Sequence, residues 1–388
     1  MHEGLTVFTS VSPSYKYSSE LALCLKMFRK ALPENSRLLF SENTLPRSLR
    51  ALIREHLSGL SPYVLIAKEP AMLLGKNAVK TLTSILDANQ ETACVLPSDI
   101  RGYRTGRTAG YYTLSGFERF SDSLFDQTVP TSPYDGRDPW MFLIRRSALS
   151  EIEVPDNPLD IPKILSPGST CISLNAYIHP FIDYYHETRA DVIHLVPVSA
   201  RSVLDIGCAR GNFGASVKKK LGCRVVGIEM NAYEAEYARK NLDEFIAGDI
   251  LSAEISETFD CITCLDVIEH FASPDLLLQK IRRLLNDGGH LLLSVPNVGH
   301  WSIIEDLIEG RWDYVPIGIL TVSHLRFFTE KTIRSLLEEA GFSIVSIDGQ
   351  SSPLPPHSEQ WATLMEKHGV NVDRKSLSFL SYYIVAKK

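Results

Sequence analysis

The sequence predicts an α/β protein built from two domains, and three observations carry this prediction. From about residue 200 onward, short apolar runs alternate with amphipathic segments, which is typical of a parallel sheet covered by helices on both faces. The first 150 residues show a similar alternation. Between the two regions, prolines cluster in VPDNPLDIPKILSPG, a composition that resists both helix and central strand. We therefore expect a first domain over residues 1–150, a linker over 151–174 and a second domain over 175–388.

In the second domain, the ends of the expected helices carry recognisable signals. Gly222 suits a helix C-terminus, and Asn231 and Ser273 suit N-caps. Thr329, with Thr332 at the capping-box position, predicts a further helix start. The last two strands are separated by a loop insertion at 349–375 without a helical signal, so we expect them to pair antiparallel. The expected strands are 200–207, 223–229, 243–249, 259–267, 289–297, 342–348 and 377–388, and the expected helices are 212–222, 231–242, 273–285 and 329–342.

Composition excludes several classes of protein. The net charge of −6 argues against nucleic acid as a partner, and no apolar run is long enough to span a membrane. The N-terminus lacks the pattern of a signal peptide, and the seven scattered cysteines suit a reducing compartment, so we expect a cytoplasmic protein. Cys261 and Cys264 lie in a predicted strand, where positions i and i+3 face opposite sides. Because no second pair exists, we expect no metal site.

The turn DIGCARGNFG follows the first apolar strand of the second domain. Dinucleotide-binding proteins place G-x-G-x-x-G at this point, but the position two residues after Gly207 is Ala209. The spacing is D-x-G-x-x-x-G, in which Asp205 ends the strand and Gly207 and Gly211 let a ligand without phosphate approach the backbone. This disfavours a dehydrogenase.

Two more acids follow the next two strands. Glu229 lies at the tip of one strand, where a carboxylate can accept both ribose hydroxyls, and Asp249 follows the other, where it can accept from an adenine amino group. Each acid alone could be a solvated loop residue. Together with Asp205, and in this order, they indicate a nucleoside ligand at the carboxyl edge of the sheet.

From about residue 175 to 388, these motifs resemble those of class I S-adenosylmethionine-dependent methyltransferases. VLDIGCARGNFG resembles the first motif of that family, with Ala209 where glycine is common, and CLDVIEHF resembles the motif after the fourth strand. The stretch from PNVGHW to the helix at Thr329 resembles a subgroup common in bacterial polysaccharide and natural-product clusters. The resemblance implies S-adenosylmethionine as cofactor, bound by Asp205, Gly207, Cys208, Gly211, Glu229, Met230, Asp249, Ile250, Asp266 and Tyr185.

Two histidines are candidates for the catalytic base. His270 lies beside Asp266 and Glu269, and His324 precedes the helix at Thr329. Histidine titrates near neutral pH, so either could accept a proton from a hydroxyl, although either could instead be structural. The candidate acceptor-binding residues are Arg326, Trp301 and Tyr314, for which an ion pair and core packing are the alternatives.

The first domain resembles, more weakly, the nucleotide-binding half of a family 2 (GT-A-like) glycosyltransferase. Lys68, Glu69 and Pro70 stand where that family has an acidic metal motif, so we expect a degenerate domain used for docking, sugar binding or dimerisation. Arg101, Arg104 and Arg107 suggest either a diphosphate-sugar site or a solvated loop.

The sequence thus predicts a methyltransferase acting on a hydroxyl of a sugar or of a polysaccharide or natural-product intermediate. The expected partner is a small-molecule or saccharide acceptor, with a homodimer as a further expectation. The alternatives are a non-catalytic scaffold with degenerate sites and a bifunctional glycosyltransferase–methyltransferase.

Overall fold

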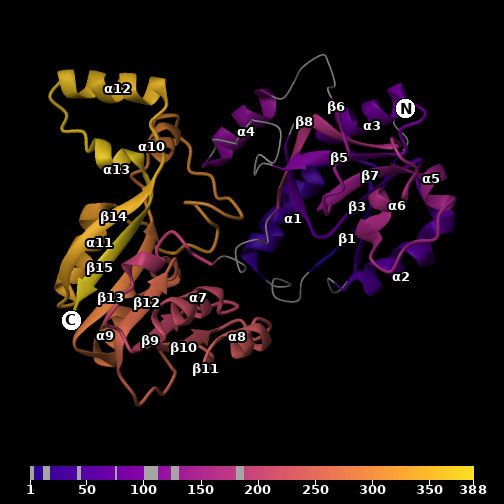
Figure 1. Cartoon of the computed structure of the whole chain (residues 1–388). Coiled ribbons are helices and arrows are strands. Elements are labelled where there is room, and N and C mark those ends of the chain that lie inside the picture. Colours follow the sequence, from indigo (N-terminus) through magenta and orange to yellow (C-terminus); the bar gives the residue numbers. More distant parts are fainter. Residues whose placement is uncertain are drawn as a thin grey trace. The chain divides into compact units, whose positions relative to one another are not determined.

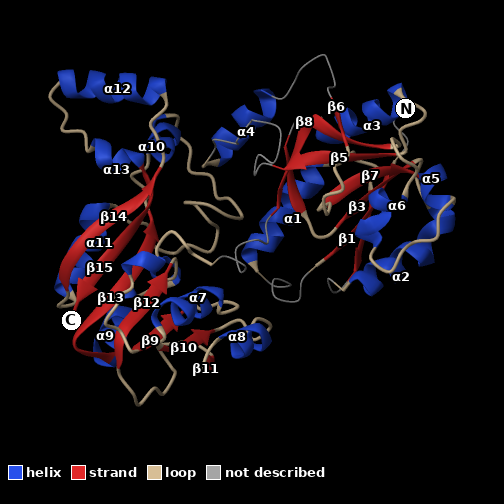
Figure 2. Cartoon of the chain, in the orientation of Figure 1, coloured by secondary structure: helices blue, strands red, loops and turns tan. Residues whose placement is uncertain are grey.

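The computed structural model of the chain divides into two compact units, residues 1–181 and 182–388 (Figure 1). It describes residues 4–11, 18–41, 45–74, 77–99, 112–123, 131–180 and 188–388. Within these ranges, no helix has the length and apolar character needed to cross a bilayer. Figure 2 shows that each unit combines a sheet with helices, as the sequence predicts.

The first unit contains a mixed sheet in the order β2-β1-β3-β7-β5-β8-β4, with β6 paired to β8. Strands β1, β2 and β3 are parallel, whereas β7 runs antiparallel to both β3 and β5. The elements are β1 (Leu5–Ser10), α1 (Ser19–Ala31), β2 (Arg37–Ser41), α2 (Pro46–His56), η2 (Leu57–Gly59), β3 (Tyr63–Ala67), β4 (Ala71–Leu74), α3 (Ala78–Ala88), β5 (Cys94–Asp99), α4 (Leu114–Ser123), β6 (Thr131–Pro133), β7 (Met141–Arg145), α5 (Arg146–Ser150), η3 (Pro158–Asp160), α6 (Ile161–Ile164) and β8 (Thr170–Pro180).

The proline-rich segment does not form the linker predicted over 151–174. Two of its prolines, Pro158 and Pro162, lie in short helices, at first-turn positions that need no backbone donor. The chain then enters β8, which pairs with β4, β5 and β6 of the first sheet. The first unit therefore extends to Phe181.

The second unit confirms the predicted α/β architecture with seven strands. Its seven-stranded sheet has the order β11-β10-β9-β12-β13-β15-β14. The elements are η5 (Ile193–Leu195), β9 (Ser202–Ile206), α7 (Asn212–Leu221), β10 (Arg224–Glu229), α8 (Ala235–Asn241), β11 (Glu244–Ala247), β12 (Phe259–Leu265), η6 (Ile268–His270), α9 (Pro274–Leu284), β13 (Leu285–Pro296), α10 (Trp301–Ile308), α11 (Glu330–Glu339), β14 (Ser343–Ser351), α12 (Pro356–Lys367), α13 (Arg374–Ser378) and β15 (Phe379–Lys387).

Five strands of this sheet, from β11 to β13, run parallel, and the predicted antiparallel pairing of the last two strands is confirmed. The segment between those two strands is not a plain loop, because it contains α12 and α13. Pro356 supplies the first turn of α12, within the stretch predicted as a loop. Asn231 caps a turn by accepting from the Tyr233 amide, and α8 begins later, at Ala235.

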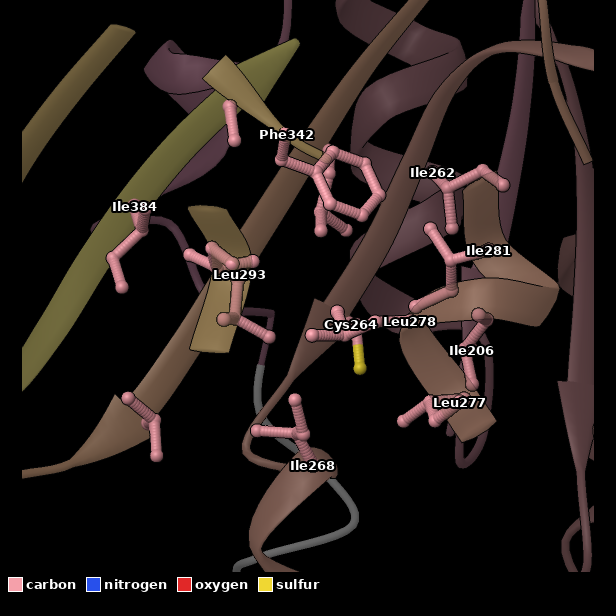
Figure 3. Packing of buried hydrophobic residues seen from close by; sticks show 14 of the residues in the cluster. Ile206, Ile262, Cys264, Ile268, Leu277, Leu278, Ile281, Leu293, Phe342 and Ile384 are labelled. Carbon is pink, nitrogen blue, oxygen red and sulfur yellow. The ribbon is translucent and has the colours of Figure 1, made fainter. Parts of the chain in front are cut away.

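Alternate residues of the central strands enter two hydrophobic cores, so both faces of the sheet are covered. Leu204 of β9 lies in the core beneath α9 and α11, whereas its neighbour Val203 lies in the core beneath α7 and α8. Figure 3 shows part of the first core, including Leu278 and Ile281 of α9 with strand residues. Cys261 and Cys264 belong to opposite cores, as the strand period predicts, and all seven cysteines are free thiols.

The capping box predicted at the start of α11 is confirmed. The Thr329 side chain accepts from the Thr332 amide, and the Thr332 hydroxyl accepts from the Thr329 amide. This fixes where α11 begins and therefore where the preceding loop, which carries His324, must end.

Candidate functional site

The glycine turn leaves β9 at the carboxyl edge of the parallel strands. Gly207 and Gly211 have φ angles of 71° and 74°, in the left-handed region that favours glycine. The amides of Gly207 and Cys208 donate to the Ile228 carbonyl at 2.9 and 3.2 Å, so the turn is held against β10. A Cβ atom on Gly207 would lie 2.5 Å from Cγ2 of Val267. The turn therefore requires glycine here for both conformation and space.

Ala209 also adopts the left-handed conformation, with φ 47°. For an L-residue this costs roughly 1–2 kcal/mol, a penalty that glycine would not carry. The Ala209 amide donates to Oε2 of Glu229 at 3.1 Å. The departure from the common glycine therefore leaves the shape of the turn intact and adds strain.

Glu229 lies at the end of β10 and joins the glycine turn to the turn after β10. Besides the Ala209 amide at Oε2, it accepts from the Asn231 amide at Oε1, at 2.8 Å. Burial raises the pKa of Glu229 above its usual value, although these backbone N–H groups oppose the rise. Each carboxylate oxygen keeps a second lone pair, so the side chain is oriented and still able to accept from a ribose hydroxyl.

Asp205 is buried, with 3% of its surface exposed, and it has a single hydrogen-bond donor. Oδ1 accepts from the Thr263 hydroxyl at 2.7 Å, whereas Oδ2 has no partner among the described residues. Burial raises the pKa of Asp205 to about 7, against the opposing effect of the Thr263 hydroxyl. A buried acceptor without a donor is uncommon and suggests that a ligand supplies the missing one.

The other predicted cofactor residues differ in what they expose. Asp249 is half-buried and accepts from the Leu251 amide at 3.0 Å, next to the buried Ile250. Met230, directly after β10, is 70% exposed. The Cys208 side chain packs into the core against Gly227, so only its backbone can face a ligand. Tyr185 lies outside the described residues, as do Arg101, Arg104 and Arg107.

Asp266, after β12, is held by partners that the sequence did not reveal. It has φ 53°, its Oδ1 accepts from the Ser294 hydroxyl at 2.8 Å, and its Oδ2 lies 2.5 Å from Nη1 of Arg189. Arg189 also contacts Asp191, which accepts from the Tyr383 hydroxyl at 2.5 Å. No spacing signal links these residues, because they come from segments far apart in the chain.

The two candidate bases come together in a cluster with Glu269, which we name the histidine cluster: Glu269, His270 and His324. The imidazole rings of the two histidines have centroids 4.9 Å apart at 79°. Nδ1 of His270 lies 3.2 Å from the Ser323 carbonyl, and Nδ1 of His324 lies 2.9 Å from the Ile319 carbonyl. Nε2 of His324 lies 3.9 Å from Oε1 of Glu269.

Glu269 is the buried member of the histidine cluster, with 1% of its surface exposed. Neither of its carboxylate oxygens has a hydrogen-bond partner among the described residues. Burial, with a further contribution from Asp266, raises its pKa well above the usual range. Its backbone carbonyl accepts from the amides of Leu325 and Arg326 at 2.8 and 3.0 Å, which joins the two loops that carry the cluster.

Of the predicted acceptor residues, Tyr314 lies in the neighbourhood of the histidine cluster. Phe327 has its ring centroid 6.4 Å from that of His324 and 6.5 Å from that of Tyr314. Trp301 is instead buried at the start of α10, against His300 and His357. The Arg326 guanidinium donates to the carbonyls of Leu325 and Ala272, which closes the loop after η6.

Comparisons with known proteins bear on residues 176–347, which match a family model described as a methyltransferase domain. The chain is 25% identical over 173 residues to the ubiquinone biosynthesis O-methyltransferase of Stutzerimonas stutzeri, covering 42% of this chain and 73% of that protein. It is 28% identical over 174 residues to the mitochondrial enzyme of the same name from Schizosaccharomyces pombe, covering 42% of this chain and 62% of that protein. A solved SAM-dependent methyltransferase from Archaeoglobus fulgidus matches with a TM-score of 0.41 and 19% identity, over 54% of this chain and 98% of that one.

Proposed function

The chain carries a class I S-adenosylmethionine-dependent methyltransferase domain, and on that premise we propose that it methylates a hydroxyl oxygen of a small-molecule acceptor. The observation that carries the proposal is the set of polar groups at one edge of the sheet. Glu229 and the glycine turn meet at the ends of β10 and β9, and the histidine cluster follows β12, the other neighbour of β9. In open α/β sheets, ligands bind at this edge.

The cofactor would bind over the glycine turn. We assign ribose recognition to Glu229, whose oxygens are oriented by two backbone amides. Asp249 would contact the adenine, and Oδ2 of Asp205, which has no partner among the described residues, would accept a hydrogen bond from the ligand. Met230, exposed directly after β10, would cover the adenosine from one side.

In the reaction, the methyl carbon leaves the sulfonium and bonds to the acceptor oxygen, S-adenosylhomocysteine departs, and the hydroxyl proton must be taken up. We propose His270 as the group that promotes this proton loss. Its Nδ1 faces a carbonyl, which can only accept, so Nδ1 carries the hydrogen and Nε2 is the basic atom. Nε2 of His324 faces Glu269, which suits a positioning role.

We propose a saccharide hydroxyl as the acceptor, with the exposed rings of Trp312 and Tyr314 forming one wall. Both rings contact Phe327, which lies beside His324, and flat apolar surfaces suit sugar rings. The relatives named ubiquinone biosynthesis O-methyltransferase support a second acceptor class, an intermediate of ubiquinone biosynthesis.

The acceptor proposal is tested with S-adenosylmethionine labelled on its methyl group. The full chain is incubated with a set of glycosides and, separately, with ubiquinone precursors, and label is sought in the product. We expect transfer to a hydroxyl oxygen, reduced roughly 10²–10⁴-fold in His270→Ala. Transfer to nitrogen only, or full activity in His270→Ala, would overturn the assignment.

For the first unit, we propose a sugar-binding role without catalysis, consistent with a degenerate GT-A-like domain. A cavity of about 300 Å³ is lined by Ser10, Lys68, Arg137 and Trp140, among others. The Lys68 ammonium lies 4.9 Å from the centre of the Trp140 ring, and Glu69 is buried. A Trp140→Ala variant that binds the same sugars as the wild type would contradict this role.

A further inference from the structure

We propose that Glu269, His270 and His324 form a binding site for a divalent cation of the zinc class. The sequence predicts no metal site, because Cys261 and Cys264 have no second pair. Glu269 and His270 lie far along the chain from His324. The fold brings the loops that carry them together at the end of β12. The inference rests on the proposed function only in placing the cation beside the methyl acceptor, since cation binding itself requires no acceptor.

The first observation is the convergence of the three donor groups. One ligand atom from each side chain, the two ring nitrogens and a carboxylate oxygen, lies within 4.8 Å of the other two. Zinc bonds to nitrogen and oxygen are about 2.0–2.2 Å long, so tetrahedral ligand atoms lie roughly 3.4 Å apart. Small rotations of the side chains would bring the three atoms from the observed separation to that distance.

The second observation is the orientation of the imidazoles. Nδ1 of His270 and Nδ1 of His324 each face a backbone carbonyl, of Ser323 and Ile319 respectively. A carbonyl only accepts, so each ring carries its hydrogen on Nδ1 and has its basic lone pair on Nε2. Histidines that bind metals almost always donate their second ring N–H in this way, because the hydrogen bond fixes both the tautomer and the ring plane.

The third observation is the carboxylate of Glu269. It is 1% exposed, and neither of its oxygens has a hydrogen-bond partner among the described residues. Burying a carboxylate without a partner is expensive, and buried charges are normally paired or bound to metals. The amides of Leu325 and Arg326 donate to the Glu269 carbonyl, which holds its backbone beside the loop that carries His324.

The donor set selects the class of cation. Two imidazole nitrogens and one carboxylate are a ligand set found in catalytic zinc sites, which keep a further position for water or substrate. Magnesium and calcium prefer oxygen ligands and would bind this site less well. The open position would take the acceptor oxygen, and the cation would favour loss of its proton to solvent before attack on the methyl carbon. Both imidazoles would then act as ligands, and His270 would promote loss of the acceptor proton by holding the cation instead of by accepting the proton itself.

The test is a titration of the chelator-treated full chain with Co²⁺, followed by visible absorption, with Zn²⁺ affinity measured by competition. We expect one site per chain in the wild type. Glu269→Gln, His270→Ala and His324→Ala should each weaken binding by more than the roughly 10–100-fold that loss of an outer partner costs. The matched control is His368→Ala, which removes an exposed histidine of the same domain and should bind as the wild type does.

Two further measurements distinguish variants that have lost a metal-binding side chain from variants that no longer fold. His324→Cys replaces one zinc ligand with another and should retain Zn²⁺, whereas a merely structural role would not predict this rescue. S-Adenosylhomocysteine binding by each variant reports whether the domain is folded. No stoichiometric Co²⁺ binding by the wild type, or equal binding by the three variants, would overturn the site and leave an ion pair between Glu269 and a protonated His324.

The metal site and the proposed function can fail separately. If the wild type binds one cation but transfers no methyl group to any hydroxyl, the site stands and the proposed function fails. If methyl transfer is unaffected by chelation and no cation binds, the proposed function stands with His270 as the base and the metal site fails.

Discussion

Asp205 and Asp260 lie at opposite ends of neighbouring strands β9 and β12, and their surroundings differ. At the amino edge, Oδ2 of Asp260 accepts from the amides of Arg201 and Ser202 at 2.9 and 3.2 Å, and Oδ1 accepts from the Asn286 amide group at 2.8 Å. These donors, the Arg201 amide first, hold the pKa of Asp260 below its usual range. At the carboxyl edge, Asp205 has one donor and a pKa raised by burial.

Other carboxylates follow the same division. Asp243, which precedes β11 at the amino edge, accepts from the Val225 amide and pairs with Lys218, each at 2.8 Å. Glu269, after β12 at the carboxyl edge, has no hydrogen-bond partner among the described residues. At the amino edge, the acids accept hydrogen bonds from backbone amides and so join neighbouring strands of the sheet. At the carboxyl edge, Asp205 and Glu269 keep carboxylate oxygens without a hydrogen-bond partner among the described residues, and this difference supports the ligand site that we propose there.

The largest effect that we expect on stability comes from Asp205. Because its pKa is about 7 in the folded chain and near 3.8 in the unfolded chain, the folded state holds the proton to higher pH. The stability that Asp205 contributes is therefore fully present below about pH 4 and is lost as pH rises through 7. Between pH 5 and pH 8, the free energy of unfolding of the wild type should fall by about 2–3 kcal/mol. That of Asp205→Asn should not show this fall.

The measurement is urea unfolding of the full chain at both pH values, followed by tryptophan fluorescence. Three of the four tryptophans, Trp301, Trp312 and Trp361, lie in the second unit and report on it. An equal pH dependence in wild type and Asp205→Asn would show that Asp205 ionises as easily as a solvated acid, and the comparison between the two edges would lose its basis.

Asp260 should behave in the opposite way. Its lowered pKa means that it is ionised throughout pH 5–8, so the stability it contributes is fully present there and is lost only as pH falls below about 4. Asp260→Ala leaves three donors without their acceptor and should cost about 2 kcal/mol, equally at pH 5 and 8. The same unfolding experiment checks this, and a clear difference between the two pH values would contradict it.

The smallest effect that we expect on stability concerns Ala209. Its backbone is strained in the glycine turn at the carboxyl edge of the sheet. Ala209→Gly removes the left-handed penalty but adds entropy to the unfolded chain, so we expect a gain of up to about 1 kcal/mol. Ala215→Gly, in the middle of α7, is the matched control and should lose about 0.5–1 kcal/mol. If both variants lose stability equally, Ala209 carries no strain.

Much of the carboxyl edge could be predicted from the sequence because its signals are local. The glycine turn, Glu229 and Asp249 each follow an apolar strand, and parallel strands place their carboxyl ends together. The capping box at Thr329 is likewise contained in four residues. The seven-stranded sheet followed from such signals taken in order.

The remainder depends on contacts between distant segments, which no local pattern encodes. The pairing of Arg189 with Asp266 joins the segment before β9 to the turn after β12. The histidine cluster needs the loops at Glu269 and His324 to meet through backbone hydrogen bonds. The prolines of the predicted linker lie partly in short helices, and the predicted loop at 349–375 contains α12, which begins at Pro356. Proline in a first helical turn looks the same in sequence as proline in a loop.

The central claim is that the cofactor binds at the carboxyl edge, and calorimetric titration of the full chain with S-adenosylhomocysteine tests it most directly. The wild type should bind one molecule per chain. Glu229→Ala, which would remove the two charge-assisted hydrogen bonds that we propose to ribose, should bind at least about 100-fold more weakly. Glu244→Ala, at the amino edge, should bind like the wild type. Absence of binding to the wild type, or equal affinity in Glu229→Ala, would contradict the account.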